Sequence, residues 1–119
     1  MSRRPDGALE SDIMAVLWDA DRALTPGDVR GRLTHELAYT TVMTVLGRLV
    51  DKGLLQRSQR GRAFAYKPAL SQAELTAQRM GDALAGAKDR ASALTGFVGG
   101  LSKRDAQLLR KAVEDLDAP

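Results

Sequence analysis

The first half of the chain contains three segments in which apolar residues recur at helical spacing. The first segment predicts an amphipathic helix that ends near residues 19–21. Its apolar face consists of Leu9, Ile13, Val16 and Leu17. A short second helix is expected over residues 26–34, because Thr25 suits an N-cap and Pro26 suits the first helical position.

The third segment, AYTTVMTVLGRL at residues 38–49, is rich in β-branched residues, which are poor helix formers. Its apolar residues keep the helical period, so we predict a helix over residues 38–52 that ends at Gly53. On a helical wheel, the residues that face the core are Val42, Val45, Leu46 and Leu49. The opposite face consists of Thr40, Thr41, Thr44, Arg48 and Asp51, flanked by Met43 and Gly47. The alternative interpretation of AYTTVMTV alone is a β-strand.

The period of the pattern changes after Gly53. The segment LLQRSQRGRAFAYKP, residues 54–68, predicts two short strands joined by a turn around Arg60, Gly61 and Arg62. Three helices followed by a hairpin are the outline of a winged helix-turn-helix domain. The predicted fold class is therefore mainly α with a small β-hairpin.

The chain after Pro68 is expected to be helical again but to hold too little apolar surface for a separate core. Ser71 and Ser102 are predicted N-caps, the first of a helix that ends near Gly86 and the second of the last helix. A short helical segment over residues 91–98 lies between these two helices. All three could fold back on the first domain, but we favour packing against the same helices of a second chain. The expected homodimer interface consists of Leu75, Met80, Leu84, Leu94, Phe97, Val98, Leu101, Leu108, Leu109, Val113 and Leu116.

The positive charge of the chain lies in its first part. Residues 1–68 hold eleven Lys and Arg against eight Asp and Glu, whereas residues 69–119 hold seven of each kind. Five basic residues and no acidic residue occur from Lys52 to Lys67. Such a run is either a solvated face or a surface for a polyanion.

A helix with a low, hydroxyl-bearing face beside an arginine-bearing hairpin suits double-stranded DNA. Short side chains allow a helix to approach the bases, and hydroxyl and guanidinium groups can bond phosphates or base edges. We therefore expect the helix over residues 38–52 in the major groove and the wing at residues 57–62 on the phosphate backbone. The expected DNA contacts are Tyr39, Thr40, Thr41, Met43, Thr44, Arg48, Arg57, Arg60 and Arg62. The alternative is a winged helix that docks a protein, although such a helix should expose larger apolar anchors.

This interpretation divides the chain into a winged-helix DNA-binding domain at residues 1–68 and a helical dimerisation region at residues 69–119. Catalysis is not expected, because the sequence has no cysteine, no glycine-rich phosphate loop and a single histidine. That histidine, His35, is interpreted as a helix C-terminal residue or a phosphate contact. No metal or other cofactor is expected, although a weak site built from carboxylates and His35 stays open.

The compartment is also indicated by what the sequence lacks. The longest apolar runs fall well short of the roughly 20 residues that span a bilayer. The first ten residues lack the apolar stretch of a signal peptide. We expect no membrane insertion and a location in the cytoplasm.

Three segments of the chain resemble the penicillinase-repressor (BlaI/MecI/CopY) family of bacterial transcriptional regulators. They are LESDIMAVLW, AYTTVMTVLGRLVDKGLL and RGRAFAYKP, and together they cover the whole predicted winged helix. The resemblance implies a homodimeric repressor that binds a dyad-symmetric operator and dimerises through its C-terminal helices. It also implies DNA contacts on the helix at Thr40, Thr41, Met43, Thr44 and Arg48, and on the wing at Arg60 and Arg62.

The resemblance further bears on how such a repressor would be released. In β-lactam-responsive members, a membrane-bound sensor protease system triggers cleavage in the dimerisation region before a phenylalanine. The similar position here is Gly96–Phe97, with glycine in place of the asparagine of those members. Copper-responsive members use C-terminal cysteines, and this chain contains no cysteine.

Overall fold

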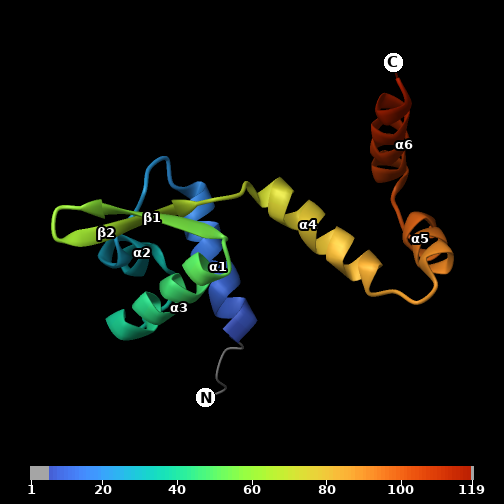
Figure 1. The fold of residues 1–119 in the computed structure, drawn as a ribbon. Helices are drawn as coiled ribbons and strands as arrows, with labels where there is room; N and C mark the ends of the chain where they lie inside the picture. Colours follow the sequence, from blue (N-terminus) through green and yellow to red (C-terminus); the bar gives the residue numbers. More distant parts are fainter. Residues whose placement is uncertain (1–5, 119) are drawn as a thin grey trace. The chain divides into compact units, whose positions relative to one another are not determined.

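A computed structural model describes residues 6–118, which divide into two compact units between Leu75 and Thr76 (Figure 1). Residues 1–5, where the sequence predicts no signal peptide, and residue 119 lie outside the described residues. The first unit contains α1 (Asp6–Asp19), α2 (Pro26–Arg32), α3 (Tyr39–Asp51), β1 (Leu55–Arg60) and β2 (Ala63–Pro68). The second unit contains all but the start of α4 (Gln72–Ala85), together with α5 (Arg90–Gly99) and α6 (Lys103–Asp117).

This order of elements confirms the predicted fold class. Three helices are followed by an antiparallel hairpin, in which β1 pairs with β2 from Leu55 opposite Pro68 to Arg60 opposite Ala63. The helix predicted over residues 26–34 ends earlier, at Arg32, because Leu33 is already extended. Within residues 6–118, no helix is long and apolar enough to cross a membrane.

One hydrophobic core holds the first unit together. It draws on all three helices and on the base of the hairpin, and it supports the helical interpretation of AYTTVMTV over the strand. Aliphatic side chains supply nearly all of this core, as the low aromatic content requires. Its buried members are Ile13, Met14, Leu17, Leu24, Val29, Val42, Val45, Leu46, Leu49, Leu55 and Tyr66.

Besides the two strands, one extended residue between α1 and α2 anchors the hairpin to the helices. The sequence pattern does not predict it. Leu24, in the connection between α1 and α2, forms a bridge with Tyr66 of β2. The N–H of Leu24 donates to the carbonyl of Tyr66 at 2.9 Å, and the N–H of Tyr66 donates back at 2.7 Å. Because both side chains are also buried in the core, the base of the wing is fixed by backbone and side chain together.

The first unit extends to Leu75, past the predicted boundary at Pro68. The indole N–H of Trp18 donates to the carbonyl of Leu70 at 2.9 Å. Ser71 and Glu74 form the predicted capping box at the start of α4, and Leu75 is only 4% exposed. The first turn of α4 therefore belongs to the first unit.

The second unit consists of capped helices whose described side chains, over residues 76–118, are all exposed or half-buried. Asp89 caps α5, where its carboxylate accepts from the backbone N–H of Ser92 at 3.0 Å. Ser102 caps α6 in the predicted manner, accepting from the N–H of Asp105 at 3.1 Å. Neither α5 nor α6 contains a buried residue within the single chain. Local hydrogen bonds thus define these helices, while their apolar faces stay uncovered.

The short α2 depends on a capping box at its N-terminus. The Thr25 hydroxyl accepts from the N–H of Asp28 at 3.2 Å, and the Asp28 carboxylate accepts from the N–H of Thr25 at 3.1 Å. These hydrogen bonds, first that from the Thr25 N–H, lower the pKa of Asp28 below its ordinary value of 3.8. The stabilisation is therefore fully present above that value and is lost as the pH falls through the lowered pKa.

Replacing Thr25 with Ala should lower the free energy of unfolding by about 0.5–2 kcal/mol, because one N–H in the first turn of α2 loses its acceptor. Urea denaturation followed by circular dichroism measures the change. Thr34→Ala, at an exposed position outside any helix, is the matched control and should change stability little. Equal losses in the two variants would contradict the importance of the cap.

Candidate nucleic-acid interface

The α3 helix presents two chemically different faces. Val42, Val45, Leu46 and Leu49 are buried, as predicted. The outer side exposes Thr40, Thr44 and Arg48, with Met43 and Tyr39 also 40% and 46% exposed, whereas Thr41 is half-buried. The glycine on this side, Gly47, has open space where a Cβ would stand. The outer face therefore combines three threonines and a glycine with the larger side chains of Tyr39, Met43 and Arg48.

Thr44 uses its hydroxyl inside its own helix. Thr44 Oγ1 donates to the carbonyl of Thr40 at 2.9 Å. A hydroxyl that donates in this way keeps its lone pairs as acceptors but has no hydrogen left for a phosphate oxygen. Thr44 in this conformation is suited to accept from a base amino group or to contact a methyl group, rather than to bind the backbone of DNA.

The N-terminus of α3 differs from those of α2, α4, α5 and α6. Thr25, Ser71, Asp89 and Ser102 cap α2, α4, α5 and α6 with side-chain oxygens. The residue before α3 is Ala38, which has no capping side chain, and the first turn contains no acidic residue. The first N–H groups of α3 are thus left without a side-chain acceptor, and they suit water or an anion such as phosphate.

Gly53 ends α3 as predicted, and its conformation shows why a glycine is needed. Its φ is +77°, in the left-handed region that favours glycine. The N–H of Gly53 donates to the carbonyl of Val50, and the N–H of Leu54 donates to that of Leu49, both at 2.9 Å. This is the Schellman pattern, which turns the chain directly into β1. The spacing between the helix and the wing is set by this turn.

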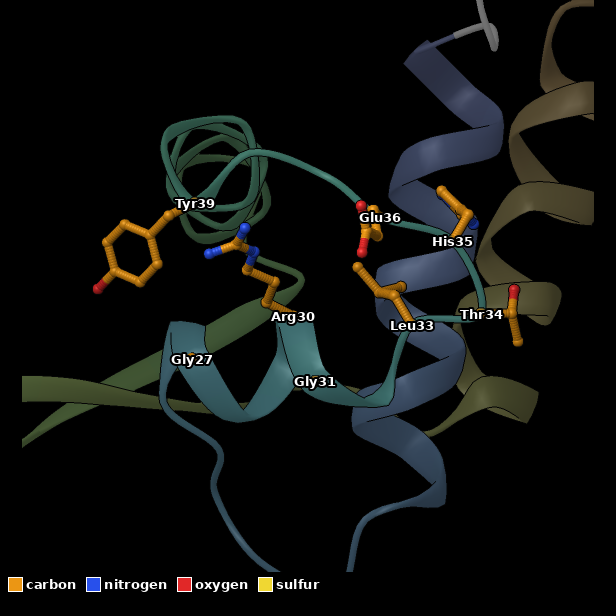
Figure 2. Close-up of a pocket in the computed structure, with 8 residues that line it drawn as sticks. All are labelled: Gly27, Arg30, Gly31, Leu33, Thr34, His35, Glu36 and Tyr39. Carbon is orange, nitrogen blue, oxygen red and sulfur yellow. The ribbon is translucent and has the colours of Figure 1, made fainter.

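A surface pocket of about 490 Å³ lies between α2 and the start of α3. Arg30 and Tyr39 lie on one side of it, and Thr34 and His35 lie nearer α1 (Figure 2). Arg30 is held by its Nε, which donates to the carbonyl of Leu37 at 2.8 Å. His35 lies in the loop rather than in the last turn of α2, so its interpretation as a helix C-terminal residue is wrong. The Nε2 atom of His35 is buried without a hydrogen-bond partner.

Metal binding finds no support at this pocket. Among the described residues 6–118, no group of three or more His, Asp or Glu side chains could together hold a metal ion.

The wing carries its arginines near a tight turn. β1 ends at Arg60 and β2 begins at Ala63, so the turn has two central residues, Gly61 and Arg62. Gly61 has a φ of +61°, which fits the first central position of a type II′ turn. Arg60 and Arg62 are both exposed beside it. The turn and the N-terminal end of α3 point to the same side of the first unit in Figure 1.

Two of the basic residues between Lys52 and Lys67 have partners that the sequence pattern did not indicate. Lys52 pairs with Glu10 of α1 at 2.8 Å and so links the end of α3 to α1. The guanidinium carbon of Arg57 lies over the ring of Phe64, 4.5 Å from its centre. The cross-strand position of Phe64 could have suggested this contact, because Phe64 is diagonal to Arg57 in a hairpin centred on Gly61.

The expected interface residues divide between the two units. The expected DNA contacts all lie in the first unit, on α3 and the hairpin. Of the residues expected in a dimer, Leu75 is buried within the first unit and has little surface left for a second chain. Leu84 and Leu101 are half-buried, and Gly96 and Phe97 lie inside α5. Apart from Leu75, Leu84 and Leu101, the residues expected in the dimer are between 37% and 85% exposed: Met80, Leu94, Phe97, Val98, Leu108, Leu109, Val113 and Leu116.

The chain is similar to known proteins over almost its whole length. The family model described as penicillinase repressor matches residues 7–115. The transcriptional regulator BlaI of Mycobacterium tuberculosis, in the strains CDC 1551 / Oshkosh and ATCC 25618 / H37Rv, is 41% identical over 117 residues. This match covers 94% of the chain and 85% of the relative.

Two solved structures match the chain at lower sequence identity than these relatives. The monomeric form of Bacillus licheniformis BlaI, solved in solution in complex with the blaP half-operator, is 26% identical, with a TM-score of 0.47. The match covers 62% of this chain and 88% of that one. A MarR family protein from Bacillus stearothermophilus is 17% identical, with a TM-score of 0.43, over 90% and 71% of the two chains.

Replacing Gly61 with Ala should destabilise the first unit by about 1–2 kcal/mol, because a Cβ is unfavourable at positive φ. Chemical denaturation measures the change. Gly31→Ala is the matched control: Gly31 lies within α2 with open space around a new Cβ, and the substitution should stabilise by about 0.5–1 kcal/mol. A neutral or stabilising Gly61→Ala would show that the turn does not need glycine.

Proposed function

Because the chain belongs to the penicillinase repressor family, we infer that it is a DNA-binding transcriptional repressor that reads its operator with α3. The observation that carries this proposal is the exposed threonine face of α3. The N-terminus of the same helix has no side-chain cap, so its first N–H groups can bind an anion. The solved relative from B. licheniformis is named as a complex with an operator half-site. We assign the corresponding role here to α3 and the hairpin.

In this proposal, the outer face of α3 lies in the major groove. Thr40, Thr41 and Thr44 keep the face low, so the helix backbone approaches the base edges closely. Thr44 accepts from a base amino group, because its own hydrogen is bonded to Thr40. Arg48 and Met43 supply a guanidinium donor and an apolar contact farther along the groove. The free N–H groups of the first turn, beside Tyr39, bind a phosphate at the groove edge.

The wing binds the sugar–phosphate backbone. Arg60 and Arg62 flank the turn, and Arg57 lies farther along β1. Guanidinium groups bond phosphate oxygens through two parallel N–H donors, which fixes the register of the protein without reading the sequence. Each neutralised phosphate releases counterions, so the affinity falls as the salt concentration rises. We also propose that the protein is located in the cytoplasm, because a repressor acts in the compartment that contains its operator.

We propose that the second unit makes a homodimer, which matches a dyad-symmetric operator. Within this unit, an apolar groove of about 380 Å³ lies between α4 and α5. The groove is lined by Met80, Gly81, Ala83, Leu84, Ala93, Leu94 and Phe97. An apolar stripe on α6 is also exposed, and it consists of Leu109, Val113 and Leu116. Exposed apolar surfaces of this kind usually become buried in a protein–protein interface.

Release from DNA would then act through this same unit. The Gly96–Phe97 bond lies inside α5, and a protease that binds an extended substrate requires the helix to open locally there. Gly96 lowers the cost of that opening, because glycine is a poor helix former. A membrane sensor or protease system acting indirectly on this segment is the route that we propose for induction.

The Thr44→Glu variant tests the placement of α3. A library of random duplexes is first enriched by binding to the full chain, and the affinity of each variant is then measured on the recovered duplex. Thr44→Glu should abolish measurable binding, because a carboxylate in the groove repels the phosphates and leaves a buried charge unpaired. Ser11→Glu, which adds the same charge on an exposed position of α1, is the control and should bind normally. Normal binding by Thr44→Glu would contradict the recognition role of α3.

Val113→Asp should convert the protein from a dimer to a monomer, because it places a charge within the exposed apolar stripe of α6. Sedimentation velocity measures the change in mass. Gln107→Asp is the control, since Gln107 lies on the opposite side of α6 and receives the same charge. A Val113→Asp variant that sediments as a dimer would show that the interface lies elsewhere.

A further inference from the structure

The wing contains a contact between Arg57 and Phe64 that the fold does not require. Arg57 lies opposite Tyr66 and Phe64 lies opposite Gln59, so Arg57 and Phe64 are diagonal neighbours on one face of the hairpin. Near the base of the wing, this face carries the buried side chains of Leu55 and Tyr66. Farther out, Phe64 is 41% exposed and lies outside the core cluster. The ring is therefore not needed to fill the core.

The contact with the ring leaves N–H donors of Arg57 for a second partner, because a guanidinium carries five of them. The guanidinium carbon lies 4.5 Å from the ring centre, within the range of a cation–π interaction. One contact with a ring cannot occupy all five N–H donors, and the donors that remain keep the fork geometry that suits a phosphate. A ring that holds the plane also reduces the rotamer freedom that the long side chain would lose on binding.

The chemistry around the pair indicates an anionic ligand. Arg60 and Arg62 lie at the turn of the same hairpin, and no acidic residue occurs between Lys52 and Lys67. Three arginines along one short hairpin suit successive phosphates of a nucleic-acid backbone, to which a preset planar fork bonds better than a flexible one.

We propose that Phe64 is a positioning residue for DNA binding: its ring holds the guanidinium of Arg57 ready to bond a phosphate of the operator backbone. This inference rests on the proposed function, because it adds a residue to the wing that binds DNA. Phe64 acts through Arg57 and makes no base contact of its own, so its effect is independent of the DNA sequence.

The test compares Phe64→Leu, Phe64→Tyr, Arg57→Ala and the double variant Arg57→Ala/Phe64→Leu in the full chain. The probe is a fluorescently labelled duplex of mixed sequence, titrated by anisotropy over a series of salt concentrations. Phe64→Leu should weaken binding about two- to fivefold, the effect of losing an exposed cation–π interaction. Phe64→Tyr, which keeps the ring face, should bind as the unaltered protein does. Arg57→Ala should reduce the magnitude of the slope of log affinity against log salt by about 0.9.

The double variant separates positioning from a structural role. If Phe64 acts through Arg57, Phe64→Leu should have no further effect once Arg57 is Ala. An equal effect in both backgrounds would overturn the proposal, as would unchanged affinity of Phe64→Leu or failure of Phe64→Tyr to restore binding. Thermal unfolding of each variant by circular dichroism checks that the fold is intact.

Failure of the inference can be distinguished from failure of the proposed function. Lys88→Ala removes one positive charge from the second unit and serves as the charge-matched control, which should lose less affinity than Arg57→Ala. If the unaltered protein does not bind the duplex even at low salt, the DNA-binding function fails and the inference falls with it. If the unaltered protein binds and the Phe64 variants match it, only the role of Phe64 is overturned.

Discussion

The packing of one face of α3 into the core is the interaction on which the rest of the molecule depends. Burial of each of Val42, Val45, Leu46 and Leu49 contributes about 1.5–3 kcal/mol, whereas the helix propensity of a β-branched residue costs at most about 0.7 kcal/mol. Burial therefore outweighs propensity, and the helix forms. Because these four side chains hold the helix in the core, the opposite face can carry small residues such as threonine and glycine.

The wing likewise has a buried part, at its base, and an exposed part, toward its turn. At its base, Leu55 and Tyr66 are buried, and the Leu24 bridge adds two backbone hydrogen bonds. Toward the turn the side chains are exposed and include Arg57, Arg60 and Arg62, with Arg57 over the ring of Phe64. A rigid base with a polar tip presents cationic groups at a defined distance from α3, and preorganisation of this kind lowers the entropic cost of binding.

The two units differ in what stabilises them. The first unit has a contiguous core, whereas the second has caps at Asp89 and Ser102 but no buried residue in α5 or α6. Caps define where helices begin, at about 1 kcal/mol each, but they do not offset the conformational entropy of a unit this small. The apolar surface of the second unit is therefore the physical reason for our proposal that a second chain completes it.

The sequence alone determined the features that depend on neighbours within one turn or one hairpin. The helical period of α3, the glycine stop at Gly53, the capping box of Ser71 and the turn at Gly61 could all be predicted, because each involves residues a few positions apart. Only the tertiary structure decided the contacts between distant residues. The bridge from Leu24 to Tyr66, the bond from Trp18 to Leu70 and the pairing of Lys52 with Glu10 depend on how whole elements pack, which no local pattern encodes.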